Sequence, residues 1–496
     1  MEVQFQKTQL PVLRRLLRSV QQQEQTQEIR LTEDLPDIGS VIGCWGQPVI
    51  RSKEWHSDEM RLSAGVQAHI LYRPEDGSQA RWVECWIPVQ MRWSFPHKQN
   101  DGIMRVLPVV QHVDARNVSA RKLIVRAVLS VCGEGYYQEQ AVACSPAGFP
   151  QDLQMMTQEY LTCIPQEAGE KQFLLEDEVT LPEKDASHVV RYSLHSELIE
   201  RKVLGDKLVF RGTANVQLLL ENEEGQLSTF DHEIPFSQYA QLENLYEPNA
   251  LADIALVLTA LEIEQTEEGK LQIKTGLTGQ YLISEEKMLQ LLQDAYSPER
   301  DISLEMEQLR VPVMLDTRSE QMRMDCIAEA DADNIVDIQV TPMLPDLQKT
   351  EDGYDITHSA SVQILYHDTQ GLLCCTQKRW AQTMQMPCHE EADLEATLAL
   401  NDKPRYQNNG TEIQIASDLK WEANCVKEQA FPVITGCTMG EQKQKDPARP
   451  SLILRRCTKD LWTLAKEANS TMDTIREVNG LSEDPEPGKL LLIPVK

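Results

Sequence analysis

The densest group of side chains capable of chemistry is the run Cys388-His389-Glu390-Glu391-Ala392-Asp393. A thiolate, an imidazole and carboxylates are all metal ligands, but no second pair of ligands stands at the spacing that metal sites use. Acidic residues are also common in the first turn of a helix, because the positive end of the helix dipole favours negative charge. The run therefore predicts a loop that leads into a short helix over residues 390–399, and we expect no metal.

The familiar local signatures of catalysis are missing from the sequence. None of the patterns G-x-x-x-x-G-K-[ST], H-E-x-x-H and G-x-S-x-G occurs, so an ATPase, a zinc protease and an α/β-hydrolase all lack support. His69 lies in an alternating run at the place that Gln217 and Gln363 take in two similar runs. We expect it to be a polar group on a strand face, and we expect neither enzyme activity nor a cofactor.

One aromatic residue near the C-terminus has two possible roles. Trp462 could stack on the face of a sugar, but a helix tryptophan in a small module is more often part of the core. The elements that would position it form a βααβ order. They are a strand (452–454), a helix from Leu461 capped by Asp460, a second helix (472–478) capped by Ser470 or Thr471 and ended by Gly480, and a final strand (487–494).

This module resembles a LysM domain. The resemblance rests on Leu461-Trp462-Thr463-Leu464-Ala465, Ile475, Asn479-Gly480-Leu481 and Pro487-Gly488-Lys489-Leu490-Leu491-Leu492-Ile493-Pro494. It implies binding of N-acetylglucosamine polymers such as peptidoglycan, in a groove between the strand-to-helix loop and the helix-to-strand loop. In this chain the groove residues would be Thr458, Lys459, Asp460, Leu461, Trp462, Leu481, Ser482, Glu483, Asp484 and Pro485.

The first of these loops departs from the family pattern. The family has Gly-Asp-Thr or Gly-Asp-Ser where this chain has Thr458-Lys459-Asp460, and loss of the glycine restricts the backbone of a loop that should approach a sugar closely. The second loop carries Glu483, Asp484 and Glu486, which suit a basic protein surface. Protein binding is therefore the favoured prediction, and glycan binding remains the alternative.

A strand-like run that ends in a turn occurs three times before this module. The copies are 66–72 before Gly77, 214–220 before Gly225 and 360–366 before Gly371, with turn glycines 148 and 146 residues apart. A second alternating run follows in each copy, at 123–129, 271–277 and 413–419. Because alternation of period two is typical of strands with one buried face, the sequence predicts tandem β-domains of sandwich or barrel type. Short helices are expected at 284–295 and 390–399.

The predicted fold class is mainly β. Leu10, Leu13, Leu16, Leu17 and Val20 stand at helical spacing with arginines between them, which predicts an amphipathic helix that packs on the first repeat and is too short to span a membrane. The predicted order is this helix (1–24), three β repeats (25–150, 165–297 and 310–437), a polar tether (438–450) and the LysM-like module (451–496).

This architecture resembles the SPOCS-domain spore-coat proteins of endospore-forming Firmicutes, especially the SipL-like clostridial group. The resemblance rests on Gln25-Thr26-Gln27 through Leu35-Pro36-Asp37-Ile38, on the repeated strand-turn runs and on the domain order. It implies a non-enzymatic adaptor in the mother-cell cytoplasm at the forespore surface, whose LysM-like tail binds the coat morphogenetic ATPase and other coat proteins. The alternative is a cell-wall or cortex protein that binds peptidoglycan.

Charge and cysteine content limit the possible partners. The chain carries 77 acidic and 48 basic residues, a formal net charge of −29, so binding to nucleic acid is not expected. Residues 451–496 hold seven residues of each sign, which places the whole excess in the first 450 residues. Twelve cysteines with no C-x-x-C pair and no secretory signal predict reduced thiols in the cytosol, unless an oxidising spore shell forms disulfides.

Overall fold

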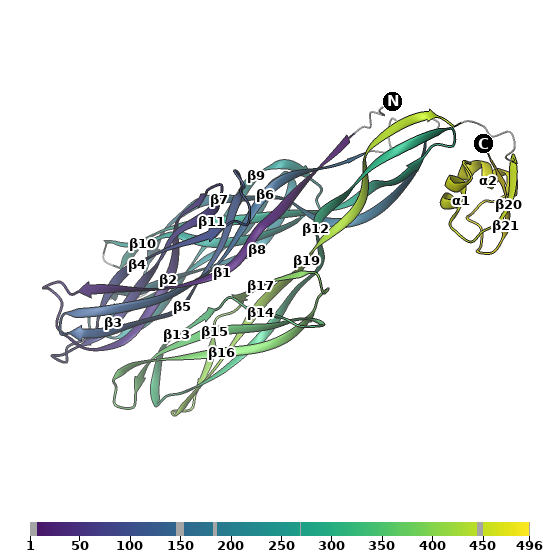
Figure 1. Cartoon of the computed structure of the whole chain (residues 1–496). Helices are drawn as coiled ribbons and strands as arrows, with labels where there is room; N and C mark the ends of the chain where they lie inside the picture. The colour runs from purple at the N-terminus through teal and green to yellow at the C-terminus, as the bar shows by residue number, and fades with distance from the viewer. Residues whose placement is uncertain (1–6, 145–152, 182–185, 268, 444–449, 496) are drawn as a thin grey trace.

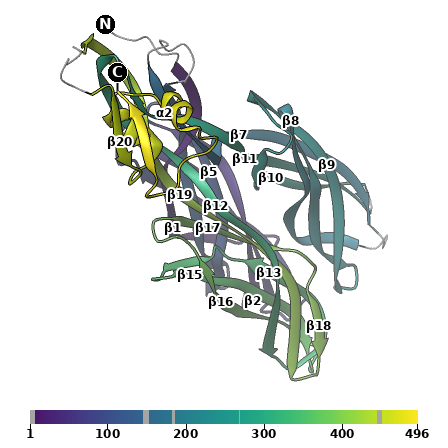
Figure 2. The same cartoon turned by 90° about the vertical axis from the view of Figure 1, so that its right-hand side faces the viewer.

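The computed structural model describes residues 7–144, 153–181, 186–267, 269–443 and 450–495, and it confirms a mainly β protein. The described residues between 7 and 443 form an elongated body of long strands, the β body, and residues 450–495 form a small tail module at one end of it (Figures 1 and 2).

The strands of the β body follow the chain in three groups, which we list here. The first group is β1 (Lys7–Arg30), β2 (Ile38–Trp55), β3 (Glu59–Pro74), β4 (Arg81–Ser94), β5 (Ile103–Ser119) and β6 (Lys122–Cys144). The second is β7 (Gln154–Thr180), β8 (Ala186–Asn222), β9 (Leu227–Tyr246), β10 (Leu251–Glu267) and β11 (Lys270–Tyr296). The third is β12 (Arg300–Glu329), β13 (Ala332–Pro342), β14 (Asp346–Lys349), β15 (Gly353–Asp368), β16 (Leu373–Pro387), β17 (Asp393–Leu400), β18 (Arg405–Asn408) and β19 (Glu412–Gln442).

In each group the first and last strands pair along their length. The three resulting sheets have the orders β1-β6-β5, β10-β11-β7 and β12-β19-β17, with β18 added to β19. A second sheet accompanies each: β2-β3-β4, β8-β9, and β13-β15-β14 with β16 paired to β15. All the pairings are antiparallel. The recurring sequence runs therefore lie on strands, as predicted: the first set in β3, β8 and β15, and the second in β6, β11 and β19.

The turn glycines after the first runs have the backbone that a hairpin needs. Gly77, Gly225 and Gly371 have φ of 74°, 79° and 76°, a region that side chains with a Cβ seldom adopt. The strands before them meet at the centre of the body. Leu71, Leu219 and Leu365 hold the same place in the three runs, and all three belong to one buried cluster.

A second cluster joins the first strands of the three groups. Val12 of β1, Ile164 of β7 and Val311 of β12 are fully buried together. The three groups thus contact one another at two levels of the body. The division into tandem copies of one domain stays a prediction.

The predicted N-terminal helix is wrong, because residues 7–30 are strand β1 and pair with β6 throughout. A bulge at Leu16 shifts the alternation of β1, so apolar residues before and after it fall at helix-like intervals. Val12 and Leu13 are both buried, in different clusters, because both faces of β1 are covered. Local spacing could not reveal a partner more than 100 residues away.

Other predicted boundaries and helices also change. Residues 284–295 belong to β11, and residues 389–392 form a turn before β17, so neither segment is a helix. The second and third strand groups begin at Gln154 and Arg300, and the predicted repeat bounds stay predictions. The predicted tether overlaps β19, which continues to Gln442, while residues 444–449 lie outside the described residues.

One disulfide contradicts the prediction of reduced thiols. Cys388, just after β16, is bonded to Cys425 of β19, with a sequence separation of 37 residues. Nine other cysteines among the described side chains are free. Because Cys388 is bonded, its sulfur is not available to a metal.

Candidate functional site

The tail module has the predicted strand-helix-helix-strand order. It consists of β20 (Leu452–Arg456), α1 (Leu461–Glu467), α2 (Met472–Asn479) and β21 (Leu490–Pro494), and the two strands form an antiparallel sheet. Leu461, Leu464, Ile475, Leu491 and Ile493 fill its core. The LysM assignment itself stays a prediction.

Local capping residues define the start of α1. The Asp460 carboxylate accepts hydrogen bonds from the Thr463 backbone N–H at 2.8 Å and from the Thr463 hydroxyl at 2.7 Å. The backbone bond from Thr463 is the main reason that the pKa of Asp460 lies below its ordinary value. Asp460, one of the predicted groove residues, is therefore a helix cap, which confirms that part of the sequence interpretation.

The second helix is bounded by Thr471 and Gly480. The Thr471 hydroxyl accepts from the Thr474 N–H at 3.1 Å, and Gly480 ends the helix in the left-handed conformation with φ 61°. Asn479 then ties the helix to the sheet. Its side chain accepts from the Leu492 N–H at 2.8 Å and donates to the Leu492 carbonyl at 2.6 Å, so it occupies the outer edge of β21.

The two predicted groove loops are held beside each other by Cys457, a residue that the sequence analysis did not single out. Its N–H donates to the Lys489 carbonyl at 2.8 Å, and its own carbonyl accepts from the Gly488 N–H at 2.7 Å. Its thiol lies 3.3 Å from the Lys459 carbonyl and 4.0 Å from that of Pro485. In the sequence, the only feature that could have pointed to Cys457 was its place between the predicted strand and the first groove loop.

The structure divides the predicted groove residues into three exposure classes. Exposed are Thr458, Lys459, Asp460, Ser482, Glu483 and Asp484; half-buried are Leu481 and Pro485; buried are Leu461 and Trp462. Ion pairs within the module hold two of the exposed side chains, Lys459 to Glu467 and Asp484 to Arg476. No ion pair to Glu483 is present among the described residues.

Trp462 is 8% exposed and belongs to the buried cluster of the module, which confirms the prediction that it is a core residue, but its hydrogen-bond partner lies in the β body. Its indole N–H donates to Asp294 of β11 at 2.8 Å, and its ring packs edge-on against Tyr296 at 4.9 Å between centroids. Lys466 forms an ion pair with the same Asp294 at 2.7 Å. Because its ring and its N–H are both engaged, Trp462 does not offer a free face to a sugar.

The turn between α1 and α2 adds two more contacts with the body. The Tyr296 hydroxyl donates to the Ser470 carbonyl at 2.9 Å, and burial raises the pKa of Tyr296. Lys443, just after β19, donates to the Asn469 side chain at 2.7 Å. The module is therefore docked on the end of the body through α1 and this turn, and the two loops stay exposed.

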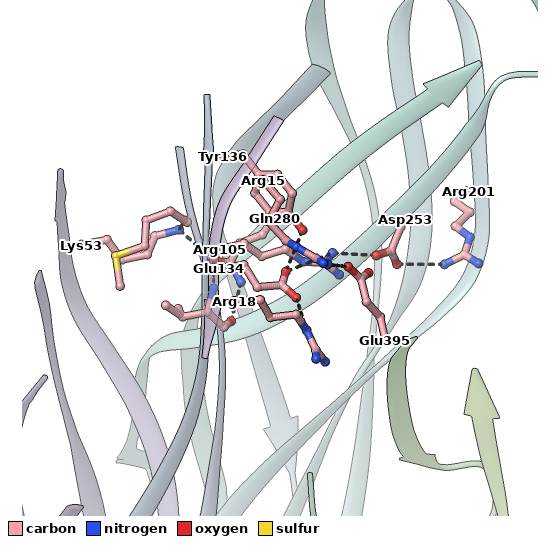
Figure 3. A network of polar contacts seen from close by, with 12 residues as sticks. Arg15, Arg18, Lys53, Arg105, Glu134, Tyr136, Arg201, Asp253, Gln280 and Glu395 are labelled. Carbon is pink, nitrogen blue, oxygen red and sulfur yellow. Dashed lines mark hydrogen bonds and ion pairs between the residues drawn. The ribbon is translucent and has the colours of Figure 1, made fainter. Parts of the chain in front are cut away.

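A second polar site lies inside the β body and was missed by the sequence analysis (Figure 3). Arg105, 6% exposed, pairs with Asp253 at 2.7 Å and lies 3.8 Å from Glu134. Glu395 pairs with Arg15. The cluster joins the three strand groups at the start of one strand in each. The third residue of β5 is Arg105, that of β10 is Asp253 and that of β17 is Glu395.

The pKa values of two carboxylates in this cluster shift in opposite directions. Burial would raise the pKa of Asp253, but the charge of Arg105 outweighs it and the pKa is lowered. Glu395 is different: burial, followed by the nearby charge of Glu134, raises its pKa. Two arginines that the sequence analysis assigned to a helix thus neutralise carboxylates of the cluster: Arg15 pairs with Glu395 of the third group, and Arg18 pairs with Glu134 of its own group.

Next to the cluster is a cavity of about 830 Å³. Its walls come from β1, β10, β12 and β17 among other strands, with charged side chains of both signs. Every charged group of the cluster named above has a partner of opposite charge, so the arrangement neutralises charge.

The described residues contain no group of three His, Cys, Asp or Glu side chains placed to hold a metal ion. No described helix has the length and apolar character needed to cross a bilayer.

Comparison with known proteins identifies one part of the β body. Residues 185–266, which contain β8, β9 and nearly all of β10, match the family described as "SipL, SPOCS domain". These residues are therefore similar to the SPOCS domain of SipL-like proteins. No curated protein and no solved structure matches it. The family indicates a sporulation-related protein associated with the spore coat, and the tail module lies outside the matched residues.

Proposed function

We propose that this protein is a non-enzymatic adaptor of endospore coat assembly. In this proposal the β body is a rigid support, and the exposed loops of the tail module bind the coat morphogenetic ATPase at the forespore surface in the mother cell. The proposal is carried by one observation: the module is fixed to the body through Trp462 and Asp294, while its loops remain open to a partner.

The charge of the second loop supports a protein partner. Glu483, Asp484 and Glu486 are exposed within four residues of one another. Such a loop favours a basic surface and has little to offer an uncharged sugar polymer. The alternative, peptidoglycan binding, is weakened because Trp462, the one aromatic residue of the predicted groove, is engaged by the β body.

Crosslinking mass spectrometry of the tagged full chain from sporulating cells tests the adaptor proposal. We expect crosslinks between residues 458–486 and the coat ATPase, lost in the double variant Glu483→Lys/Glu486→Lys. The matched control is Glu223→Lys/Glu224→Lys, the same charge change in the exposed turn after β8. Absence of coat-protein crosslinks from the unmodified chain would refute the proposal.

A sedimentation assay with insoluble peptidoglycan separates the alternative. The full chain should stay in the supernatant at high salt. Salt-resistant retention that is lost on changing Thr458 or Ser482 would favour the glycan-binding function instead.

A further inference from the structure

The sheet of the tail module has an apolar outer face that nothing in the described residues covers. Its members are Leu452, Leu454 and Arg456 of β20 and Leu490, Leu492 and Pro494 of β21, here called the leucine face. They point the same way, because Leu454 pairs with Leu492, Arg456 with Leu490 and Leu452 with Pro494 across the two strands. The four leucines are 47%, 60%, 55% and 38% exposed.

The opposite face of the same sheet is covered by the two helices of the module. Leu491 and Ile493 point inward and are fully buried, together with side chains of α1 and α2. The two-stranded sheet is thus apolar on both sides, but only one side carries helices. In Figure 1 the strands form the right-hand side of the module, away from the body. Docking on the body uses α1 and leaves the leucine face open.

The charge of the leucine face differs from that of the chain as a whole. Strands β20 and β21 contain no acidic residue, and Arg456 is the single charged member of the face. Arg456 is exposed and has no ion-pair partner among the described residues, and the exposed Lys489 directly precedes Leu490. An apolar surface with a basic end favours an apolar segment with an acidic end.

The size of the face argues for a single docked segment. Its six residues are few compared with the roughly 20–30 residues a side of a standard protein interface, so a dimer held by this face alone would be weak. A strand of five residues is about 15 Å long, and a helix is about 10 Å wide, so one helix covers both strands. We propose that the leucine face binds an amphipathic, acidic helix of a partner protein, and this proposal rests on the proposed adaptor function.

A binding assay with synthetic peptides tests this site on the full chain. The probe is a fluorescent helical peptide with leucines at i, i+3, i+4 and i+7 and glutamates beside them. A lysine version and a scrambled peptide serve for comparison. By fluorescence anisotropy we expect the glutamate peptide to bind at least tenfold more tightly than the lysine peptide. The variant Arg456→Glu should reverse that preference.

Variants of the leucine face and of the β body distinguish binding at this site from nonspecific hydrophobic binding. Leu454→Ser/Leu492→Ser should weaken binding of the glutamate peptide at least tenfold. Leu174→Ser/Leu245→Ser, which changes two exposed leucines of the β body (73% and 81% exposed), should leave it unchanged. Hydrogen exchange of α1 in each variant reports whether the module is still folded. If the module is folded and the peptide binds the first variant normally, the proposal is wrong.

Two other occupants give different results. If the unmodified chain self-associates in sedimentation and Leu454→Ser/Leu492→Ser abolishes this, the face binds a second copy and the proposal fails. Binding to vesicles of phosphatidylglycerol and phosphatidylcholine that depends on the same leucines would assign it to a lipid surface, which also overturns it. If coat crosslinks depend on Glu483 and Glu486 but no peptide binds, the adaptor function stands and the leucine face is refuted. Missing crosslinks refute the adaptor function whatever the peptides show.

Discussion

Replacement of Asp294 by alanine should detach the tail module from the β body. The Asp294 carboxylate accepts the Trp462 indole N–H and pairs with Lys466. Loss of the acceptor leaves a buried N–H unpaired, which costs about 1–2 kcal/mol, and loss of a half-exposed ion pair adds about 0.5 kcal/mol. The sum is about 2 kcal/mol, or roughly a 30-fold shift toward the undocked module.

Hydrogen exchange of peptides covering residues 461–470 in the full chain measures this shift. We expect about 30-fold faster exchange at protected amides in Asp294→Ala. In Asp294→Asn an amide oxygen can still accept from the indole, so the change should be about twofold. The control is Asp484→Ala, an exposed acid of the same module that pairs only within it. Unchanged exchange in Asp294→Ala, or equal acceleration in the control, would refute the docking argument.

Three other perturbations have outcomes set by the β body. Serine in place of both Cys388 and Cys425 opens a bridge that spans 37 residues and should lower the free energy of unfolding by about 3–4 kcal/mol, measured by urea titration without reductant. Arg105→Ala removes the buried cation that pairs with Asp253 and should cost about 3 kcal/mol, whereas the exposed Arg323→Ala should change stability by less than about 0.5 kcal/mol; equal effects would contradict the buried-cluster reasoning. Burial lowers the pKa of His69 from 6.5 to about 3, so the unfolded chain binds the proton before the folded chain does as the pH falls. The free energy of unfolding should therefore fall by roughly 1.4 kcal/mol for each pH unit of acidification between those two values. His69→Gln should flatten that part of the stability–pH curve, and an unchanged slope would contradict the reasoning.

The sequence was most informative where structure depends on near neighbours. Asp460 and Thr471 cap helices whose free N–H groups lie three residues away, and Gly480 supplies a left-handed backbone at the helix end. The turn glycines after β3, β8 and β15 followed from the same kind of local rule. Such interactions can be read from spacing alone, and those predictions are confirmed.

It failed where a distant strand decided the outcome. Residues 10–20 have helical spacing, but pairing with β6 and burial on both faces make them a strand. The predicted helix over 284–295 is overridden in the same way by pairing with β7. Propensity differences of a few tenths of a kcal/mol per residue cannot compete with an extended ladder of hydrogen bonds and a buried face.

The amino-acid sequence by itself determined the mainly β class, the strand runs, their turns and the βααβ order of the tail, because these depend on alternation and capping over a few residues. Only the tertiary structure decided that Arg15 meets Glu395, that Trp462 binds Asp294, and that four leucines of the tail stay exposed. The first two contacts join residues 380 and 168 positions apart. No local pattern records such partners, since they are selected by how whole sheets pack around a shared core.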